Sequence, residues 1–181
     1  MLISSNSNSG NDNDYENIID PGIIWSFAAC NGQQNPVWDK WNWLIGEWDG
    51  TGSGQPGQGD GIFTFKPEPD KKIIVRKGHS TYKGSANKSE AVHDDLMIIY
   101  PDYTGNVSKA IYFDNEGHTI NYSITYVEKS IIFLSSRTQN TPLFRLSYTL
   151  LENDLVNTKF EMSQDSEKFT TYTEGKSRRT K

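Results

Sequence analysis

The sequence predicts an all-β protein, an up-and-down antiparallel β-barrel of about ten strands with a short N-terminal helix. Three observations carry this prediction. Apolar and polar residues alternate in successive runs after residue 44, which is typical of half-buried strands. Short stretches rich in Gly, Pro, Asn and Asp separate the runs and suit tight turns between antiparallel neighbours. Because no longer helical pattern interrupts the runs, a parallel sheet with crossover helices is not expected.

The expected strands follow one another closely: 44–54, 61–66, 71–82, 91–100, 106–114, 118–127, 129–137, 142–151, 154–163 and 168–177. An open meander of this length would leave two unpaired edges, and curling it until the last strand meets the first removes them. A two-sheet sandwich is the alternative. The barrel is favoured because Greek-key crossings in a sandwich need longer connections than this chain offers.

The chain divides into three expected parts. Residues 1–20 are rich in Ser, Asn and Asp without a periodic pattern, so we expect a disordered tail. Residues 21–43 are expected to form a strap and a short helix that begins near Pro36. Trp38 and Trp41 share one face of that helix and are expected to plug one end of the barrel. Residues 44–181 form the barrel itself.

Composition limits the classes of function. The net charge of −5 and the pI of about 5.2 argue against nucleic-acid binding, which depends on clustered Lys and Arg. No apolar run approaches the ~20 residues that span a bilayer, and no signal peptide is recognised. The single cysteine, Cys30, excludes an internal disulfide framework. We therefore expect a soluble, cytoplasmic protein with no nucleic-acid or membrane partner.

Gly46-Glu47-Trp48 lies on the first expected strand, after a short helix and before the remaining strands. This segment resembles the Gly-x-Trp signature of lipocalin-like (calycin) barrels. The resemblance implies that Trp48 closes the barrel base and packs against an arginine of the last strand, Arg178 or Arg179. Residues 44–52 and the basic C-terminal cluster are similar to the ten-stranded nitrobindin-like barrels and related uncharacterised bacterial and archaeal proteins. The similarity covers roughly residues 40–180.

The nitrobindin resemblance would imply haem, held by a histidine close to the C-terminus. This chain has no histidine after His118, so haem chemistry does not transfer directly and the cofactor stays unknown. What the resemblance implies is a container, because a barrel of about eight to ten strands is either filled by side chains or holds one small ligand.

Histidines and carboxylates offer few catalytic candidates. His79, His93 and His118 lie on three expected strands, and their spacing requires no shared metal site, so no metal is predicted. Adjacent strand residues point to opposite faces, so Asp95 can pair with His93 whereas Asp94 cannot face the same side. Glycines 52, 54 and 57 match a dinucleotide-binding spacing without its βαβ context and are expected in a hairpin loop.

The leading functional hypothesis is a non-enzymatic barrel that binds a small hydrophobic or planar ligand in its interior. Alternation predicts inward-facing aromatic side chains, with Arg76 or His79 and tyrosine hydroxyls orienting the ligand. The expected ligand-binding residues are Trp48, Arg76, His79, Tyr100, Tyr122, Tyr126, Tyr148 and Phe160, and Phe113, Phe133 and Phe144 are also expected to face inward.

Two alternatives stay open. One is a haem-binding or isomerase-type enzyme that uses His79 or His93 as an acid–base group. The other is a solid barrel that acts as a structural or interaction domain, with a homodimer as one form of it. The sequence itself assigns no catalytic residue.

Overall fold

The structure is a computed structural model, and it describes residues 38–55, 57–84, 89–137 and 141–180. The predicted tail, most of the predicted strap and Cys30 lie outside the described residues.

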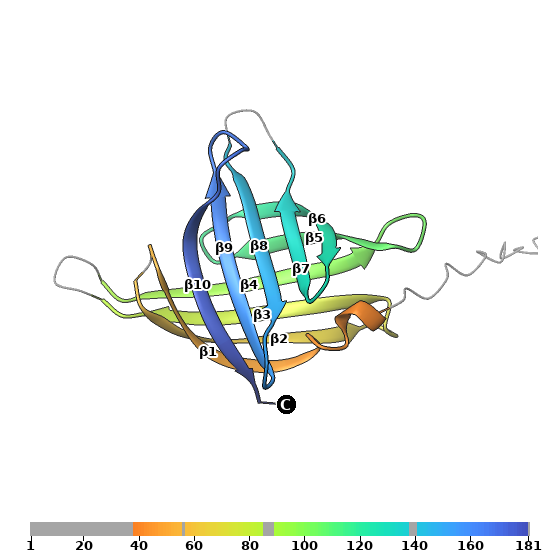
Figure 1. Cartoon of the computed structure of the whole chain (residues 1–181), viewed down its shortest axis with the longest axis horizontal. Helices are drawn as coiled ribbons and strands as arrows, with labels where there is room; N and C mark the ends of the chain where they lie inside the picture. Colours follow the sequence, from red (N-terminus) through yellow and green to blue (C-terminus); the bar gives the residue numbers. More distant parts are fainter. Residues whose placement is uncertain (1–37, 56, 85–88, 138–140, 181) are drawn as a thin grey trace, which may run out of the picture. The chain divides into compact units, whose positions relative to one another are not determined.

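Ten antiparallel strands form one closed barrel, which confirms the predicted fold class (Figure 1). Each strand pairs with its neighbours in the chain, and the first pairs with the last. The strands are β1 (Gly46–Gly54), β2 (Gly59–Glu68), β3 (Ile73–Tyr82), β4 (Ala91–Pro101), β5 (Val107–Asp114), β6 (Thr119–Val127), β7 (Ser130–Ser135), β8 (Leu143–Leu150), β9 (Leu155–Ser163) and β10 (Thr170–Arg179).

The two ends of the barrel differ. One end, here called the base, carries the β2–β3, β4–β5, β6–β7 and β8–β9 turns, and the opposite end is called the rim (Figure 1). The base is closed by η1 (Asp39–Trp41), a 3-10 helix shorter than the helix that Pro36 suggested. Trp41 is fully buried there, with ring centroids 6.0–6.2 Å from Phe65, Tyr126 and Phe133. The short helix therefore plugs the base.

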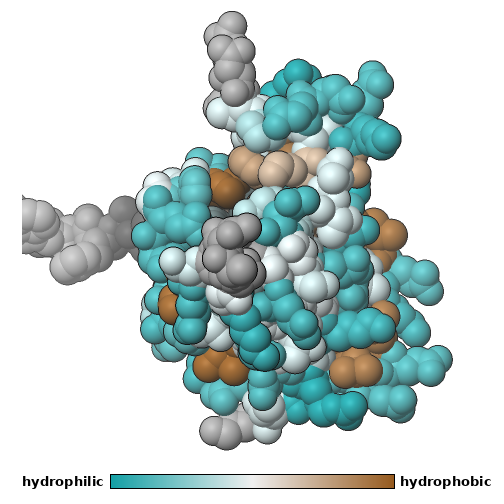
Figure 2. Space-filling view, turned by 90° about the vertical axis from the view of Figure 1, so that its left-hand side faces the viewer, coloured by the Kyte–Doolittle hydropathy of each residue, from teal (hydrophilic) through white to brown (hydrophobic). Residues whose placement is uncertain are grey.

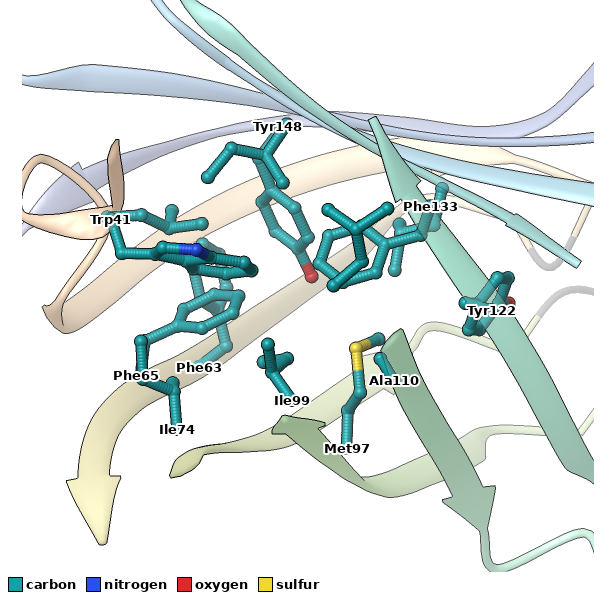
Figure 3. Packing of buried hydrophobic residues seen from close by; sticks show 14 of the residues in the cluster. Trp41, Phe63, Phe65, Ile74, Met97, Ile99, Ala110, Tyr122, Phe133 and Tyr148 are labelled. Atoms are coloured by element: carbon teal, nitrogen blue, oxygen red, sulfur yellow. The ribbon is translucent and has the colours of Figure 1, made fainter. Parts of the chain in front are cut away.

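Large apolar side chains fill the barrel above this plug. The Tyr148 ring extends from β8 into the middle of the barrel and meets Phe63, Phe65 and Phe133 at centroid distances of 5.2–6.0 Å (Figure 3). The fully buried side chains include Trp41, Trp48, Tyr148, Phe65, Phe133, Leu44, Ile74, Met97, Ile99, Ile131 and Val156. Because such rings pack edge to face at these distances, this cluster is the hydrophobic core.

Glycine lets the strands approach closely where β1 meets β10. A Cβ atom at Gly175 would lie 2.7 Å from the Thr51 carbonyl oxygen, closer than packed atoms allow. The glycine-rich segment is thus part of the barrel wall, and Gly57 lies in the β1–β2 turn with a φ of +112°.

The outer surface is mainly hydrophilic. The face shown in Figure 2 is polar over most of its area, with apolar residues in separate spots. Scattered spots of this kind are normal on a globular surface. Within the described residues, no helix is long and apolar enough to cross a membrane.

Candidate functional site

A buried ion pair lies on the inner face of β3 and β4. Arg76 is 9% exposed, and its Nη1 pairs with Oδ1 of Asp95, whose side chain is 6% exposed. The guanidinium also lies 5.5 Å from the ring centroid of Phe63. Inner residues of β3 alternate with outer ones, so Arg76 follows the buried Ile74 and precedes Gly78 on the same face.

Gly78 makes room for this pair. A Cβ atom at position 78 would lie 2.7 Å from Arg76 Nη1 and would also collide with Oδ2 of Asp95. A glycine inside a strand often marks such a close approach. Any side chain at this position would displace one member of the pair.

Besides the Nη1 and Oδ1 atoms of the ion pair itself, three buried polar atoms inside the barrel make no hydrogen bond of normal geometry among the described residues. They are Arg76 Nε and the hydroxyls of Tyr148 and Thr158. Tyr148 and Thr158 face each other across β8 and β9. Burial raises the pKa of the Tyr148 phenol, and the nearby Arg76 guanidinium opposes that rise through its charge and through a contact with the hydroxyl that falls outside normal hydrogen-bond geometry. Buried polar atoms are normally paired, so these three are where a bound molecule would make its hydrogen bonds.

His93 lies on the inner face of β4 closer to the rim. Its Nδ1 is 3.1 Å from a Glu116 carboxylate oxygen, and its Nε2 is 2.8 Å from the Tyr112 hydroxyl. Asp95 Oδ2 is 4.0 Å from the same Nε2. The sequence prediction that His93 and Asp95 share a face is confirmed, and Asp94 lies on the outer face.

The turn between β5 and β6 places Glu116 beside His93. Asn115 anchors the turn to β4, because its backbone N–H donates to the Asp94 carbonyl at 3.0 Å and its side-chain amide to the Val92 carbonyl at 3.1 Å. Asp114 accepts the backbone N–H groups of Glu116 and His118 at 3.0 and 2.9 Å. Burial opposes ionisation of Asp114, but these bonds and the His118 side chain outweigh it and lower its pKa.

Half-exposed aromatic rings line the inner face near the rim. Phe144 and Phe160 stack at a centroid distance of 5.7 Å, and Tyr172 meets the Phe160 ring edge-on at 6.0 Å. Tyr112 and Ile120 cover the inner faces of β5 and β6 and are also only partly buried. Solvent therefore reaches the inner face from this end, whereas the base is sealed.

Trp48 and two of the predicted tyrosines lie inside but form the base and core. The Arg179 guanidinium lies 4.4 Å over the Trp48 ring and donates to the Ile45 and Trp43 carbonyls, so Arg179, not Arg178, is the expected partner. Tyr122 is 3% exposed. The Tyr126 hydroxyl accepts from Trp41 Nε1 at 2.9 Å and donates to the Val107 carbonyl at 2.6 Å.

Two of the predicted ligand-binding residues lie on the outer face. His79 is half-exposed, and its Nδ1 lies 2.6 Å from an oxygen of Asp94, so it does not reach the interior. His79 is three positions after Arg76, and alternation puts the two residues on opposite faces. Tyr100 follows the fully buried Ile99 and therefore points outward, which corrects the expected inward position.

Phe113 is a further correction, since it is 36% exposed on the outer face while its neighbour Tyr112 faces inward. The sequence prediction named none of Tyr112, Glu116, Gly78 and Thr158 as a site residue. By the alternation of side chains along a strand, Tyr112 lies on the same face as Ala110, and Thr158 lies on the same face as Val156. This signal was present in the sequence. Glu116 lies in a turn and carries no periodic signal.

The residues present do not fit haem. Phe65, Phe133 and Tyr148 fill the barrel core, so a macrocycle would have to displace them. Within the described ranges, no three side chains from His, Cys, Asp and Glu are grouped to hold a metal ion.

The closed ten-stranded barrel, with Trp48 and Arg179 sealing its base, defines a lipocalin-like (calycin-like) fold. One solved structure shares this fold, and a second is less similar. The crystal structure of Rv2717c from M. tuberculosis has a TM-score of 0.56 and 11% identity, over 81% of this chain and 98% of that one. The S-type phycobiliprotein lyase CPES from Guillardia theta has a TM-score of 0.49 and 8% identity, over 82% of this chain and 95% of that one.

No family model matches the sequence. No curated protein matches it either. At these identities the structural likeness shows the fold alone.

Proposed function

We propose that the barrel binds a small, neutral molecule with a planar apolar body and a hydrogen-bond acceptor, which enters from the rim. The observation that carries this proposal is the set of buried, unpartnered atoms beside the core: Arg76 Nε and the Tyr148 and Thr158 hydroxyls. A buried polar group without a hydrogen bond costs about 1–3 kcal/mol, and a ligand oxygen that accepted the bond would remove this cost. The proposal takes from the nitrobindin-like resemblance only a barrel that holds a small ligand, and it does not include haem.

The apolar body of the ligand fits the aromatic residues near the rim. Phe144, Phe160 and Tyr172 present partly exposed ring faces and edges on the interior side of β8, β9 and β10. Ligand sites combine such apolar walls with a few polar groups that fix orientation. Here Arg76 would supply a donor deeper in the barrel.

Charge favours a neutral ligand over an anion. The Arg76 charge is already neutralised by Asp95, and the carboxylates of Asp114 and Glu116 lie on the same side of the barrel. An added carboxylate or sulfonate would meet more negative than positive charge in a poorly solvated place.

A matched pair of dyes tests the proposal. The neutral dye 6-acetyl-2-dimethylaminonaphthalene carries a carbonyl acceptor on planar rings, and 6-dimethylaminonaphthalene-2-sulfonate carries an anionic sulfonate in place of the acetyl group. We expect saturable binding of the neutral dye, measured by its fluorescence and by quenching of the barrel tryptophans, with at least about tenfold weaker binding of the sulfonate, a difference of about 1.4 kcal/mol.

Phe160→Ala and Phe113→Ala form a matched pair of variants, because one ring faces inward and the other outward. Phe160→Ala should weaken binding of the neutral dye about tenfold, and Phe113→Ala should leave it unchanged. Equal effects of the two variants, or the absence of saturable binding, would refute an interior site.

A filled barrel that acts through its surface is the second candidate. Two hollows in the described part of the chain, of about 300 and 320 Å³, lie away from the Arg76 cluster. One is lined by residues of β1, β9 and β10, and the other lies at the base between Lys40 and Glu128. Binding that responds to Lys40→Ala but not to Phe160→Ala would favour this candidate.

A further inference from the structure

The side chains of Glu116, His93 and Tyr112 form a continuous hydrogen-bonded chain at the inner face. We infer that His93 is a general base that removes a proton from a carbon next to the carbonyl of a neutral, planar substrate. The inference rests on the proposed function, because the substrate occupies the same interior site. It adds a reaction, proton transfer leading to isomerisation, to the binding of the molecule.

The geometry fixes which nitrogen of His93 carries the proton. An ionised carboxylate can only accept, so the 3.1 Å contact with Glu116 requires a proton on Nδ1. In the neutral ring Nε2 then has a free lone pair, which accepts the Tyr112 O–H at 2.8 Å. A base oriented by a third group is the arrangement that catalysis by proton transfer needs. Nε2 is thus ready to take a proton once the Tyr112 hydroxyl turns away.

The groups around His93 suit this reaction. Its side chain is 24% exposed, which leaves it reachable from the rim, whereas the outward His79 pairs with Asp94 in solvent. Burial raises the pKa of the Tyr112 phenol, so this residue keeps its proton and acts as a neutral donor. The charged and titratable groups near His93 are Arg76, Tyr82, Asp95, Tyr112, Asp114 and Glu116.

The proposed step balances without a cofactor. The C–H proton moves to His93 Nε2, and the electron pair of the broken bond moves to the carbonyl oxygen, which gives an enolate and an imidazolium. Arg76 Nε and the Tyr148 hydroxyl would donate to the enolate oxygen, since both are buried donors without partners. Where the substrate has a C=C bond β,γ to the carbonyl, the enolate is a dienolate. The imidazolium then returns the proton to the γ carbon and the C=C bond moves into conjugation with the carbonyl, so that the substrate is isomerised and no proton is gained or lost.

5-Nitrobenzisoxazole is a direct probe of such a base because it is neutral, planar and carries one acidic C–H. A base removes that proton, the C=N bond becomes a nitrile, and the N–O bond breaks to give 2-cyano-4-nitrophenolate, which is coloured. We expect the full chain to accelerate this reaction at least about 100-fold over buffer, the range of a positioned base.

His93→Ala should remove the acceleration, and the matched outer variant His79→Ala should retain it. Binding of 6-acetyl-2-dimethylaminonaphthalene is measured in parallel to separate the two proposals. Dye binding without acceleration, or acceleration that survives in His93→Ala, would overturn the role of His93 and leave the proposed binding function standing. Absence of dye binding would overturn both.

Glu116 is a positioning residue in this scheme. Glu116→Ala should lower the rate about tenfold, and Glu116→Asp should restore part of it. Nitrogen-15 NMR of the His93 ring gives an independent measurement, since the chain requires the proton on Nδ1. The tautomer should shift toward Nε2–H in Glu116→Ala, and an unchanged spectrum would refute the positioning role.

Discussion

Tyr148→Phe removes a hydroxyl that lies in the fully buried core and has no partner among the described residues. Such a group lost its bonds to water on folding without replacing them, at a cost of about 1–3 kcal/mol. The phenylalanine keeps the ring contacts with Phe63, Phe65 and Phe133. We therefore expect the free energy of unfolding to rise by about 1–3 kcal/mol, and Tm by about 2–12 °C for a domain of this size.

Tyr126→Phe is the matched control, because the same atom is removed with the opposite expected sign. The Tyr126 hydroxyl joins Trp41 Nε1 to the Val107 carbonyl, and burial raises the pKa of the phenol to about 12. Its loss leaves both partners unsatisfied near the plug, so we expect destabilisation of about 1–3 kcal/mol.

Urea unfolding followed by tryptophan fluorescence measures both variants, and an unchanged m value shows that the unfolded states are comparable. If Tyr148→Phe destabilises the protein as Tyr126→Phe does, then its hydroxyl is bonded in the native state and the reasoning fails. The same variant should weaken binding of an acceptor-bearing ligand, which would show that the hydroxyl serves the site and not the fold.

Three further predictions concern the ion pair and one turn. Arg76→Met should lower the free energy of unfolding, measured in urea, by about 3–5 kcal/mol, because it leaves the Asp95 carboxylate buried alone. Adding Asp95→Leu should recover most of this loss, and equal losses in the single and double variants would contradict the coupling of the two residues. Gly78→Ala should cost about 1–3 kcal/mol in the same assay because its Cβ would lie 2.7 Å from the guanidinium, and no loss would mean that the pair moves freely. Hydrogen bonds from Thr104 and from the Ser108 hydroxyl lower the pKa of Asp102 from 3.8 to about 2. The contribution of Asp102 to the free energy of unfolding is therefore present above pH 3.8 and lost as pH falls through 2. Asp102→Asn should be less stable than wild type near neutral pH in thermal unfolding, with the difference closing toward pH 2, and a constant difference would contradict the assignment.

The fold was predictable because its signals are local. In β6, alternate residues from Ile120 to Tyr126 face inward as their period of two requires, and short turns join β2 to β3, β5 to β6, β6 to β7 and β8 to β9. The i, i+2 spacing likewise placed His93 and Asp95 on one face. These features depend only on neighbouring residues, so no knowledge of the closed barrel was needed to find them.

The errors arose in strands where residues on both faces are apolar or aromatic. In β4, Ile98, Ile99 and Tyr100 are all apolar or aromatic, so alternation alone does not say which face is inside. The same ambiguity exchanged Phe113 for Tyr112 in β5. The contact of Glu116 with His93 depends on how Asn115 anchors one turn to another strand, a long-range arrangement that no spacing in the sequence encodes.

The composition of the interior favours a binding site over a filled scaffold. A barrel selected for stability alone would gain from replacing the Arg76–Asp95 pair with apolar side chains of similar volume, because a buried ion pair rarely repays its desolvation. This barrel keeps the pair, leaves the Tyr148 and Thr158 hydroxyls unpaired, and makes room for the pair with Gly78. Each of these features costs stability, and all of them lie between the sealed core and the end that solvent reaches. Departures from stable packing that gather in one place are typical of functional sites.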